Sequence, residues 1–216
     1  MQSELLQQLR QHKIVAIVRG VRADLADRAV QALADGGIRL IEVTMNTESA
    51  LEMIPRWKER FAGQLRIGAG TVLDVPMAQA AISAGAEFII SPGLNDAVVR
   101  YAVEQGIEIW PGTMTPTEIT RAWQLGASAV KVFPLGTLGT QYLKDLRAPL
   151  GHIPIIAVGG ITLDNIHDFL QNGAIAAGLG SNLVDNKLIE AQRFDELAEL
   201  ARRYVAAVQG EERASS

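Results

Sequence analysis

The stretch GGIRLIEV, residues 36–43, has the form that decides the fold: glycine after a helical pattern, then a short apolar run. The same form returns as AGAEFIIS (84–91), QGIEIWPG (105–112), LGASAVKVF (125–133) and NGAIAAGLG (172–180). Glycine readily takes the left-handed conformation that commonly ends a helix. Each copy therefore predicts a helix end that leads directly into a β-strand.

Outward from these segments, the same alternation of helix-ending glycines and short apolar runs continues along the chain. Glycines in this helix-ending context are Gly37, Gly63, Gly85, Gly106, Gly126, Gly151 and Gly173. Short, nearly all-apolar runs predict eight strands, at Ile14–Val18, Leu40–Val43, Arg66–Ala69, Phe88–Ile90, Ile107–Trp110, Ala129–Val132, Ile155–Val158 and Ala176–Leu179. Helical patterns occupy Ala23–Asp35, Val75–Ala84, Asn95–Glu104, Pro116–Leu125 and Leu163–Gln171. Strands that are apolar on both faces are typical of a parallel sheet covered by helices.

Strands that alternate with helices indicate a parallel α/β fold, either a closed barrel or a doubly wound open sheet. Eight near-equal units favour a single (β/α)₈ barrel. We expect an extra helix over Ser3–Gln11, before the first strand, and a terminal helix over Phe194–Val208. Because no Pro-, Ser- or charge-rich linker divides the chain, we expect one domain over residues 1–210 and a flexible tail over residues 211–216.

The composition argues against several classes of protein. The net charge is −4 and the basic residues are scattered, whereas nucleic-acid binding needs a clustered basic face. No apolar run approaches the ~18–20 residues of a membrane span, and the N-terminus lacks the features of a signal peptide. The chain has no cysteine, and its three histidines, His12, His152 and His167, have no metal-binding spacing. We therefore expect a cytoplasmic protein without a metal site, a membrane partner or a nucleic-acid partner.

The carboxyl ends of the strands are the place to look for function, because (β/α)₈ enzymes carry their active sites there. Read in chain order, these ends are Arg19, Glu42, Thr71, Pro92, Gly112, Lys131, Gly159-Gly160 and Gly180-Ser181. The ring is selected by position alone, yet it contains a lysine, a carboxylate, an arginine and a hydroxyl. Such a set predicts an active site.

Lys131 lies inside the apolar run SAVKVF, where a lysine is costly unless it is paired or neutral. One interpretation is an inward lysine held by a salt bridge. The other is an amine whose pKa, ~10.4 in water, falls through desolvation and a nearby arginine. Such an amine attacks a ketone and forms an iminium that accepts electrons.

Glu42, between Ile41 and Val43, is the second charged residue in an apolar strand. It is either only the ion-pair partner of Lys131 or a general acid–base that shuttles protons during imine formation and bond cleavage. Arg19 is either a surface residue or a bidentate ligand for a substrate carboxylate. Thr71, in IGAGTV, can donate a hydrogen bond to the same carboxylate or keto group.

Two glycine-rich turns follow the last two strands. They are Val158-Gly159-Gly160-Ile161-Thr162 and Gly178-Leu179-Gly180-Ser181-Asn182. At these two strands they match the common phosphate site of barrels, where backbone N–H groups and a helix N-terminus hold the anion. A phosphorylated ligand is therefore expected.

With these residues in view, the chain resembles the family of 2-keto-3-deoxy-6-phosphogluconate aldolases, which includes the 4-hydroxy-2-oxoglutarate aldolases. The likeness spans nearly the whole chain, through HKIVAIVRG, GGIRLIEVTMNT, IGAGTVLD, AEFIISPGL, PGTMTPTE, KVFPLGTLGTQYLKDLRAPL, AVGGITLDNI and GLGSNLV. It implies a cofactor-free, homotrimeric Schiff-base aldolase that releases pyruvate and D-glyceraldehyde 3-phosphate. Under it, the residue roles are Lys131 as nucleophile, Glu42 as proton shuttle, Arg19 and Thr71 at the pyruvate carboxylate, Gly159, Gly160, Gly180 and Ser181 at the phosphate, and Pro92 and Phe133 as walls.

Two positions depart from the gluconate-type pattern. Asn46 stands where some members have arginine, and Val158 stands where many have threonine. These forms resemble the galactonate-specific branch, whose substrate differs at C4, whereas PGTMTPTE resembles ordinary gluconate-type members. A hydroxyl donor replaced by valine can change stereochemical preference. The preferred C4 epimer therefore stays open. Three other functions also stay open: a 4-hydroxy-2-oxoglutarate aldolase, another phosphate-binding barrel such as an isomerase or a thiamine-phosphate-synthase-like transferase, and a non-catalytic sugar-acid sensor.

Overall fold

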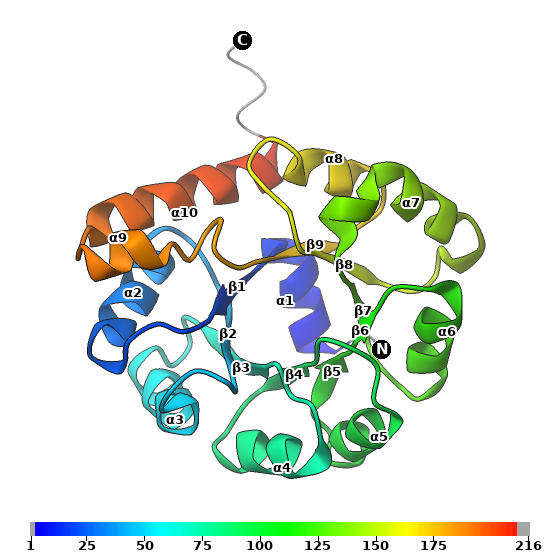
Figure 1. Cartoon of the computed structure of the whole chain (residues 1–216), viewed down its shortest axis with the longest axis horizontal. Helices are drawn as coiled ribbons and strands as arrows, with labels where there is room; N and C mark the ends of the chain where they lie inside the picture. Colours follow the sequence, from blue (N-terminus) through cyan, green and yellow to red (C-terminus); the bar gives the residue numbers. More distant parts are fainter. Residues whose placement is uncertain (1–2, 211–216) are drawn as a thin grey trace.

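The computed structural model describes residues 3–210, so the expected tail over residues 211–216 lies outside the described residues. The chain forms a ring of parallel strands surrounded by helices (Figure 1). The strands are β1 Ile14–Val18, β2 Leu40–Thr44, β3 Arg66–Gly70, β4 Phe88–Ile90, β5 Glu108–Trp110, β6 Gly112–Thr113, β7 Val130–Val132, β8 Ile155–Val158 and β9 Ala176–Leu179. The predicted α/β barrel is confirmed.

The helices cover the outside of the ring, apart from the first one. They are α1 Glu4–His12, α2 Ala23–Asp35, α3 Ala50–Arg60, α4 Val75–Ser83, α5 Asp96–Glu104, α6 Pro116–Gln124, α7 Leu135–Leu150, α8 Ile166–Gln171, α9 Asn186–Glu190 and α10 Phe194–Gln209. The sequence patterns did not identify the helices α3, which contains Pro55, α7, which is kinked at Gly139, and the short α9. Each of these three breaks or shortens the regular helical pattern.

Within residues 3–210, nine strands fill eight barrel positions, because the fifth strand is divided by Pro111. The hydrogen-bonded order is β5-β4-β3-β2-β1-β9-β8-β7-β6. β5 pairs with β4, and β6 pairs with β7. The Lys131 N–H donates to the Pro111 carbonyl over 3.0 Å, which extends the pairing of β6 with β7 to the residue between β5 and β6. The predicted strand Ile107–Trp110 is therefore only the first half of the fifth strand.

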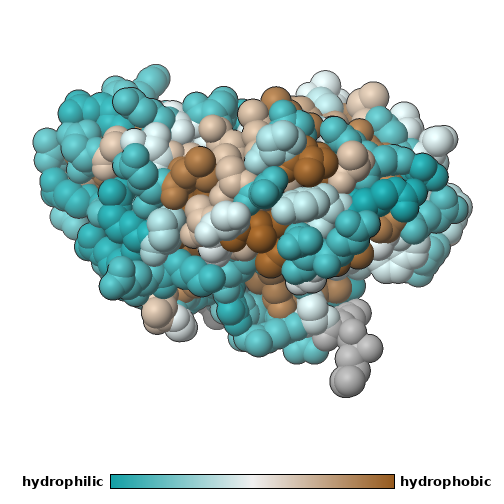
Figure 2. All heavy atoms as spheres, turned by 90° about the horizontal axis from the view of Figure 1, so that it is seen from below, coloured by the Kyte–Doolittle hydropathy of each residue, from teal (hydrophilic) through white to brown (hydrophobic). Residues whose placement is uncertain are grey.

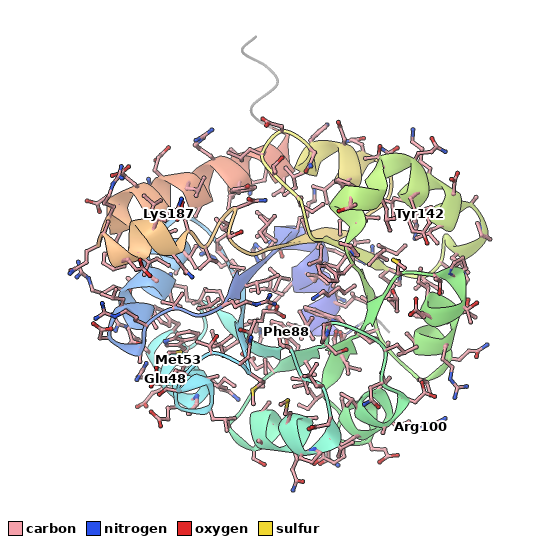
Figure 3. All side chains as sticks on the ribbon, in the orientation of Figure 1. Glu48, Met53, Phe88, Arg100, Tyr142 and Lys187 are labelled. Atoms are coloured by element: carbon pink, nitrogen blue, oxygen red, sulfur yellow. The ribbon has the colours of Figure 1, made fainter. Side chains whose placement is uncertain are left out.

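The barrel has one core inside and one outside. The inner cluster consists of Leu6, Leu9, Val15, Ile17, Leu40, Phe88, Ile90, Trp110, Ala129, Ile156, Val158 and Ala176. Phe88 points into the ring and stacks on Trp110 at a centroid distance of 4.6 Å, whereas Arg100 of α5 points outward (Figure 3). α1 contributes Leu6 and Leu9, so the extra N-terminal helix closes one end of the barrel and leaves the other end for the site.

The helix-ending glycines mostly behave as the sequence predicts. Positive φ angles are found at Gly37, Gly63, Gly85, Gly106, Gly126 and Gly173. Gly151 is the exception, with φ −57° and ψ −23°. There the Arg147 guanidinium donates to the carbonyls of Gly151 (2.6 Å) and Ile153 (2.7 Å), which takes over the role of a left-handed cap.

Candidate active site

A pocket of about 620 Å³ opens at the carboxyl ends of the strands. Its lining includes nearly every residue expected in the site: Arg19, Asn46, Thr71, Pro92, Lys131, Phe133, Val158, Gly159, Gly160, Gly180 and Ser181. Glu42 lies in a smaller cavity that also borders Lys131 and Val158. The structure thus brings all the predicted site residues to one place, with Lys131 and Val158 bordering both cavities.

Lys131 is the middle residue of β7, and its side chain turns into the barrel between the outward-facing Val130 and Val132. It is only 6 % exposed. Burial lowers the Lys131 pKa, the nearby Glu42 carboxylate opposes that shift, and the Arg19 charge adds to it. Nζ lies 5.2 Å from the centre of the Phe133 ring. The amine is therefore closer to its neutral, nucleophilic form than an ordinary lysine.

Glu42, on β2, is 1 % exposed, and its Oε2 has no hydrogen-bond partner among the residues that the structure describes. Burial raises its pKa, against the smaller opposing effects of Lys131 and Arg19. No salt bridge joins it to Lys131 within residues 3–210. A simple buried ion pair therefore does not describe the two groups.

The Glu42 carboxyl group has room only because Gly70 lies beside it on β3. A Cβ placed on Gly70 would approach the Glu42 Cδ to 2.6 Å, well inside van der Waals contact. A glycine at the end of the neighbouring strand therefore gives the carboxyl group its position. No sequence pattern predicted this contact between Gly70 and the Glu42 carboxyl group.

Arg19 and Thr71 face each other at the rim of the pocket. The Arg19 Nη2 donates to the Thr71 Oγ1 over 3.4 Å, and the Arg19 carbonyl accepts from Asn186 Nδ2 over 3.2 Å. Thr71 has φ +59°, the left-handed conformation that a β-branched residue rarely takes. This backbone conformation places the hydroxyl beside the guanidinium, where both can reach one anionic group.

The two glycine turns also reach the pocket. Gly159 and Gly160 have φ angles of +85° and +75°. The N–H groups of Gly160, Ile161 and Ser181 donate to no acceptor within the described part of the chain. Unpaired N–H groups beside a pocket suit a bound anion.

The sequence-based prediction gave no individual role to several lining residues: Ile17, Gly20, Val184 and Asn186, and also Ile161, Gly178 and Asn182, which it included only as members of the two glycine-rich turns. Asn182 is the last residue of the second glycine turn and Asn186 follows it closely, which is the only sequence signal that marks them. Each of their side-chain amides donates to a backbone carbonyl, Asn182 to that of Ile161 and Asn186 to that of Arg19.

A second opening, of about 690 Å³, lies at the other end of the barrel beside α1. Its cations are already engaged. Arg66 bonds to Glu4, Glu87 and Gln8, while Lys58 and Arg39 donate to backbone carbonyls. The groups that suit catalysis gather instead around Lys131.

Among residues 3–210, no group of His, Cys, Asp or Glu side chains is arranged to hold a metal ion. In the same range, no helix is both long enough and apolar enough to cross a membrane.

Comparison with known proteins places this geometry in a family. The family model of KDPG and KHG aldolases matches residues 5–200. The chain belongs to this aldolase family. A 2-dehydro-3-deoxy-phosphogluconate aldolase of Treponema pallidum is 36 % identical over 92 % of this chain and 95 % of its own. A 2-dehydro-3-deoxy-6-phosphogalactonate aldolase of Escherichia coli K12 is 34 % identical over 91 % and 96 %.

Solved structures of the aldolase family superpose closely. Native KDPGal is 34 % identical, with a TM-score of 0.86 over 92 % of this chain and 95 % of the other. KDPG aldolase from Legionella pneumophila, with pyruvate captured as a covalent carbinolamine, is 25 % identical, with a TM-score of 0.83 over 88 % and 93 %. The relatives thus include both gluconate- and galactonate-type enzymes at similar identity.

Proposed function

We propose that this aldolase uses Lys131 to form a Schiff base with a phosphorylated 2-keto-3-deoxy sugar acid and splits it into pyruvate and D-glyceraldehyde 3-phosphate. The observation that carries the proposal is the pairing of a buried amine of lowered pKa with a buried carboxyl group of raised pKa beside the pocket. The pyruvate carbinolamine of the Legionella relative supports it.

The substrate is held at both ends. Arg19 and Thr71 bind the carboxylate next to the ketone, since a guanidinium offers two parallel donors to a carboxylate. The phosphate lies against the turns at Gly159-Gly160 and Gly180-Ser181, while Pro92 and Phe133 wall the sugar chain. This orientation brings the C2 ketone to Lys131.

The reaction proceeds in balanced steps. Neutral Lys131 adds to C2, and the carbinolamine loses water after Glu42 delivers a proton to the hydroxyl, giving the iminium. Glu42, now a carboxylate, accepts the C4 hydroxyl proton directly or through a water as the C3–C4 electron pair moves into the iminium. The aldehyde leaves, and the enamine takes a proton at C3 from Glu42, which becomes a carboxylate again. Water then adds to the new iminium and its released proton returns to Glu42, so that pyruvate leaves and neutral Lys131 is restored.

Asn46 and Val158 are the positions that we expect to set the C4 epimer. Both line the pocket, and Val158 offers no hydrogen-bonding group. Because Val158 provides no hydroxyl donor for the C4 substituent, we expect this enzyme to favour the galactonate epimer. Rates on the gluconate and galactonate epimers, together with 4-hydroxy-2-oxoglutarate, decide the substrate.

Borohydride trapping tests the mechanism. Incubation with pyruvate and borohydride should add one reduced pyruvate at Lys131, seen by intact mass and peptide mapping, and Lys131→Ala should abolish both the adduct and turnover. An adduct at Lys144 would contradict the proposed nucleophile, and no adduct at all would favour a non-catalytic sensor or another phosphate-binding barrel. EDTA should leave the activity unchanged.

We also propose a cytoplasmic homotrimer assembled through the surface around α4. That helix, VPMAQAAIS, contains no charged residue, and Leu73, just before it, is 50 % exposed. Apolar residues gather in the middle of the face seen in Figure 2, with hydrophilic residues on either side. An uncharged outer helix face is typical of contacts between subunits.

A further inference from the structure

Three consecutive carbonyl groups in the turn after β8 are each held by a donor from another segment. The Gly159 carbonyl accepts from the Gly136 N–H over 2.7 Å. The Gly160 carbonyl accepts from Asn165 Nδ2 over 3.0 Å, and the Ile161 carbonyl accepts from Asn182 Nδ2 over 2.7 Å. Neither Gly136 nor Asn165 lines the pocket, so the first two carbonyls point away from it.

The planarity of trans peptide units determines the direction in which the N–H groups of this turn point. Within one unit the carbonyl and the next N–H point in opposite directions. The carbonyls of Gly159 and Gly160 face outward, so the N–H groups of Gly160 and Ile161 face the pocket. Those two N–H groups have no acceptor within residues 3–210. The turn thus presents two aligned donors to whatever anion the pocket holds.

Asn165 and Asn182 restrain a turn that would otherwise be free to rearrange. Gly159 and Gly160 lack side chains, so their peptide units can flip at little steric cost. Asn165 prevents this with both ends of its amide: Oδ1 accepts from the Thr162 N–H over 2.8 Å while Nδ2 donates to Gly160. Asn182 comes from the turn after β9, so its bond also fixes the distance between the two glycine turns.

We propose that Asn165 and Asn182 are positioning residues, which hold the Gly159–Ile161 turn with its N–H groups directed at the substrate phosphate. The inference rests on the proposed function, because that function places the phosphate at this turn. Neither side chain needs to touch the anion. A site that is rigid before binding loses less conformational entropy when the ligand arrives, so the benefit appears as affinity for the phosphorylated substrate.

The test measures phosphate binding separately from Schiff-base chemistry. Asn165→Ala and Asn182→Ala should each raise KM for the sugar acid phosphate on the order of tenfold, with little change in kcat, as expected for lost uniform binding. Inhibition by inorganic phosphate should weaken in parallel. Borohydride trapping with pyruvate, which carries no phosphate, should keep its rate and half-saturating concentration. Asn172→Ala is the matched control, because its Nδ2 donates to the Asp168 carbonyl over 2.7 Å away from the pocket.

Two results would overturn the inference. If both variants kept the KM and phosphate inhibition of Asn172→Ala, the amides would not position the turn. If pyruvate trapping fell together with phosphate affinity, the residues would be merely structural. The two variants act from different turns, so a folding defect in one leaves the other as the test. A parent enzyme that gives no pyruvate adduct would instead contradict the proposed function.

Discussion

At the scale of single residues, Lys131 and Glu42 perturb each other less than burial perturbs both. Desolvation is the largest cause for each, lowering the lysine pKa and raising the carboxyl pKa, while their mutual attraction opposes both shifts. Burial therefore moves each group toward its neutral form. A neutral amine and a protonated carboxyl group are the two forms that carbinolamine formation and dehydration require.

Glu42→Gln should change how stability depends on pH. The folded-state Glu42 pKa is raised, so its contribution to stability is full below the unfolded-state pKa and is lost as pH rises through the folded-state value. Without Glu42, the Lys131 pKa falls further, so the stability of the variant gains more as pH rises. This effect also makes the decline with pH steeper for the parent than for the variant. Urea midpoints from about pH 4 to about pH 8 should fall more steeply for the parent than for the variant. Parallel curves would refute this assignment of the raised pKa.

At the scale of elements, α1 closes the barrel end opposite the site. Leu9 is fully buried there in the inner cluster. Leu9→Ala should lower the free energy of unfolding by about 2–5 kcal/mol, since a buried leucine leaves a cavity. KM should stay constant, because the pocket lies at the far end. Leu51→Ala, at a side chain 43 % exposed, is the control for urea unfolding. A loss as small as that of the control would mean that α1 is only loosely packed.

Local sequence patterns predicted the elements that follow local rules. Glycine caps, apolar strands and the ring of residues at the strand ends could be read in order, and Lys131 and Glu42 emerged as charges in apolar runs. The division of the fifth strand at Pro111 could not be read, since it depends on how two neighbouring strands pair. The same holds for Asn165, whose two bonds to the turn after β8 depend on the folded backbone, and for Gly70, whose role is the space it leaves for a side chain on another strand.

At the scale of the whole molecule, the outer helices differ in charge around the ring. The first turn of α10 contains Asp195 and Glu196, and the last turn of α3 contains Lys58 and Arg60, whereas α4 has no charged residue. Charged helix faces suit water, and an uncharged one suits a neighbouring subunit. The pocket opens at the end of the barrel rather than on this flank, so assembly through α4 leaves substrate access to each subunit's own strand ends.

Gln79→Arg tests this surface. Gln79 is exposed on α4, so the substitution adds a charge to the proposed contact without removing any core packing. Burying an unpaired guanidinium between subunits is unfavourable, so the variant should sediment as smaller species at concentrations where the parent is trimeric. Gln124→Arg adds the same charge at an exposed glutamine on α6 and should leave the assembly intact. Equal masses for the parent and both variants would place the subunit contact elsewhere, and a monomeric parent would refute the trimer itself.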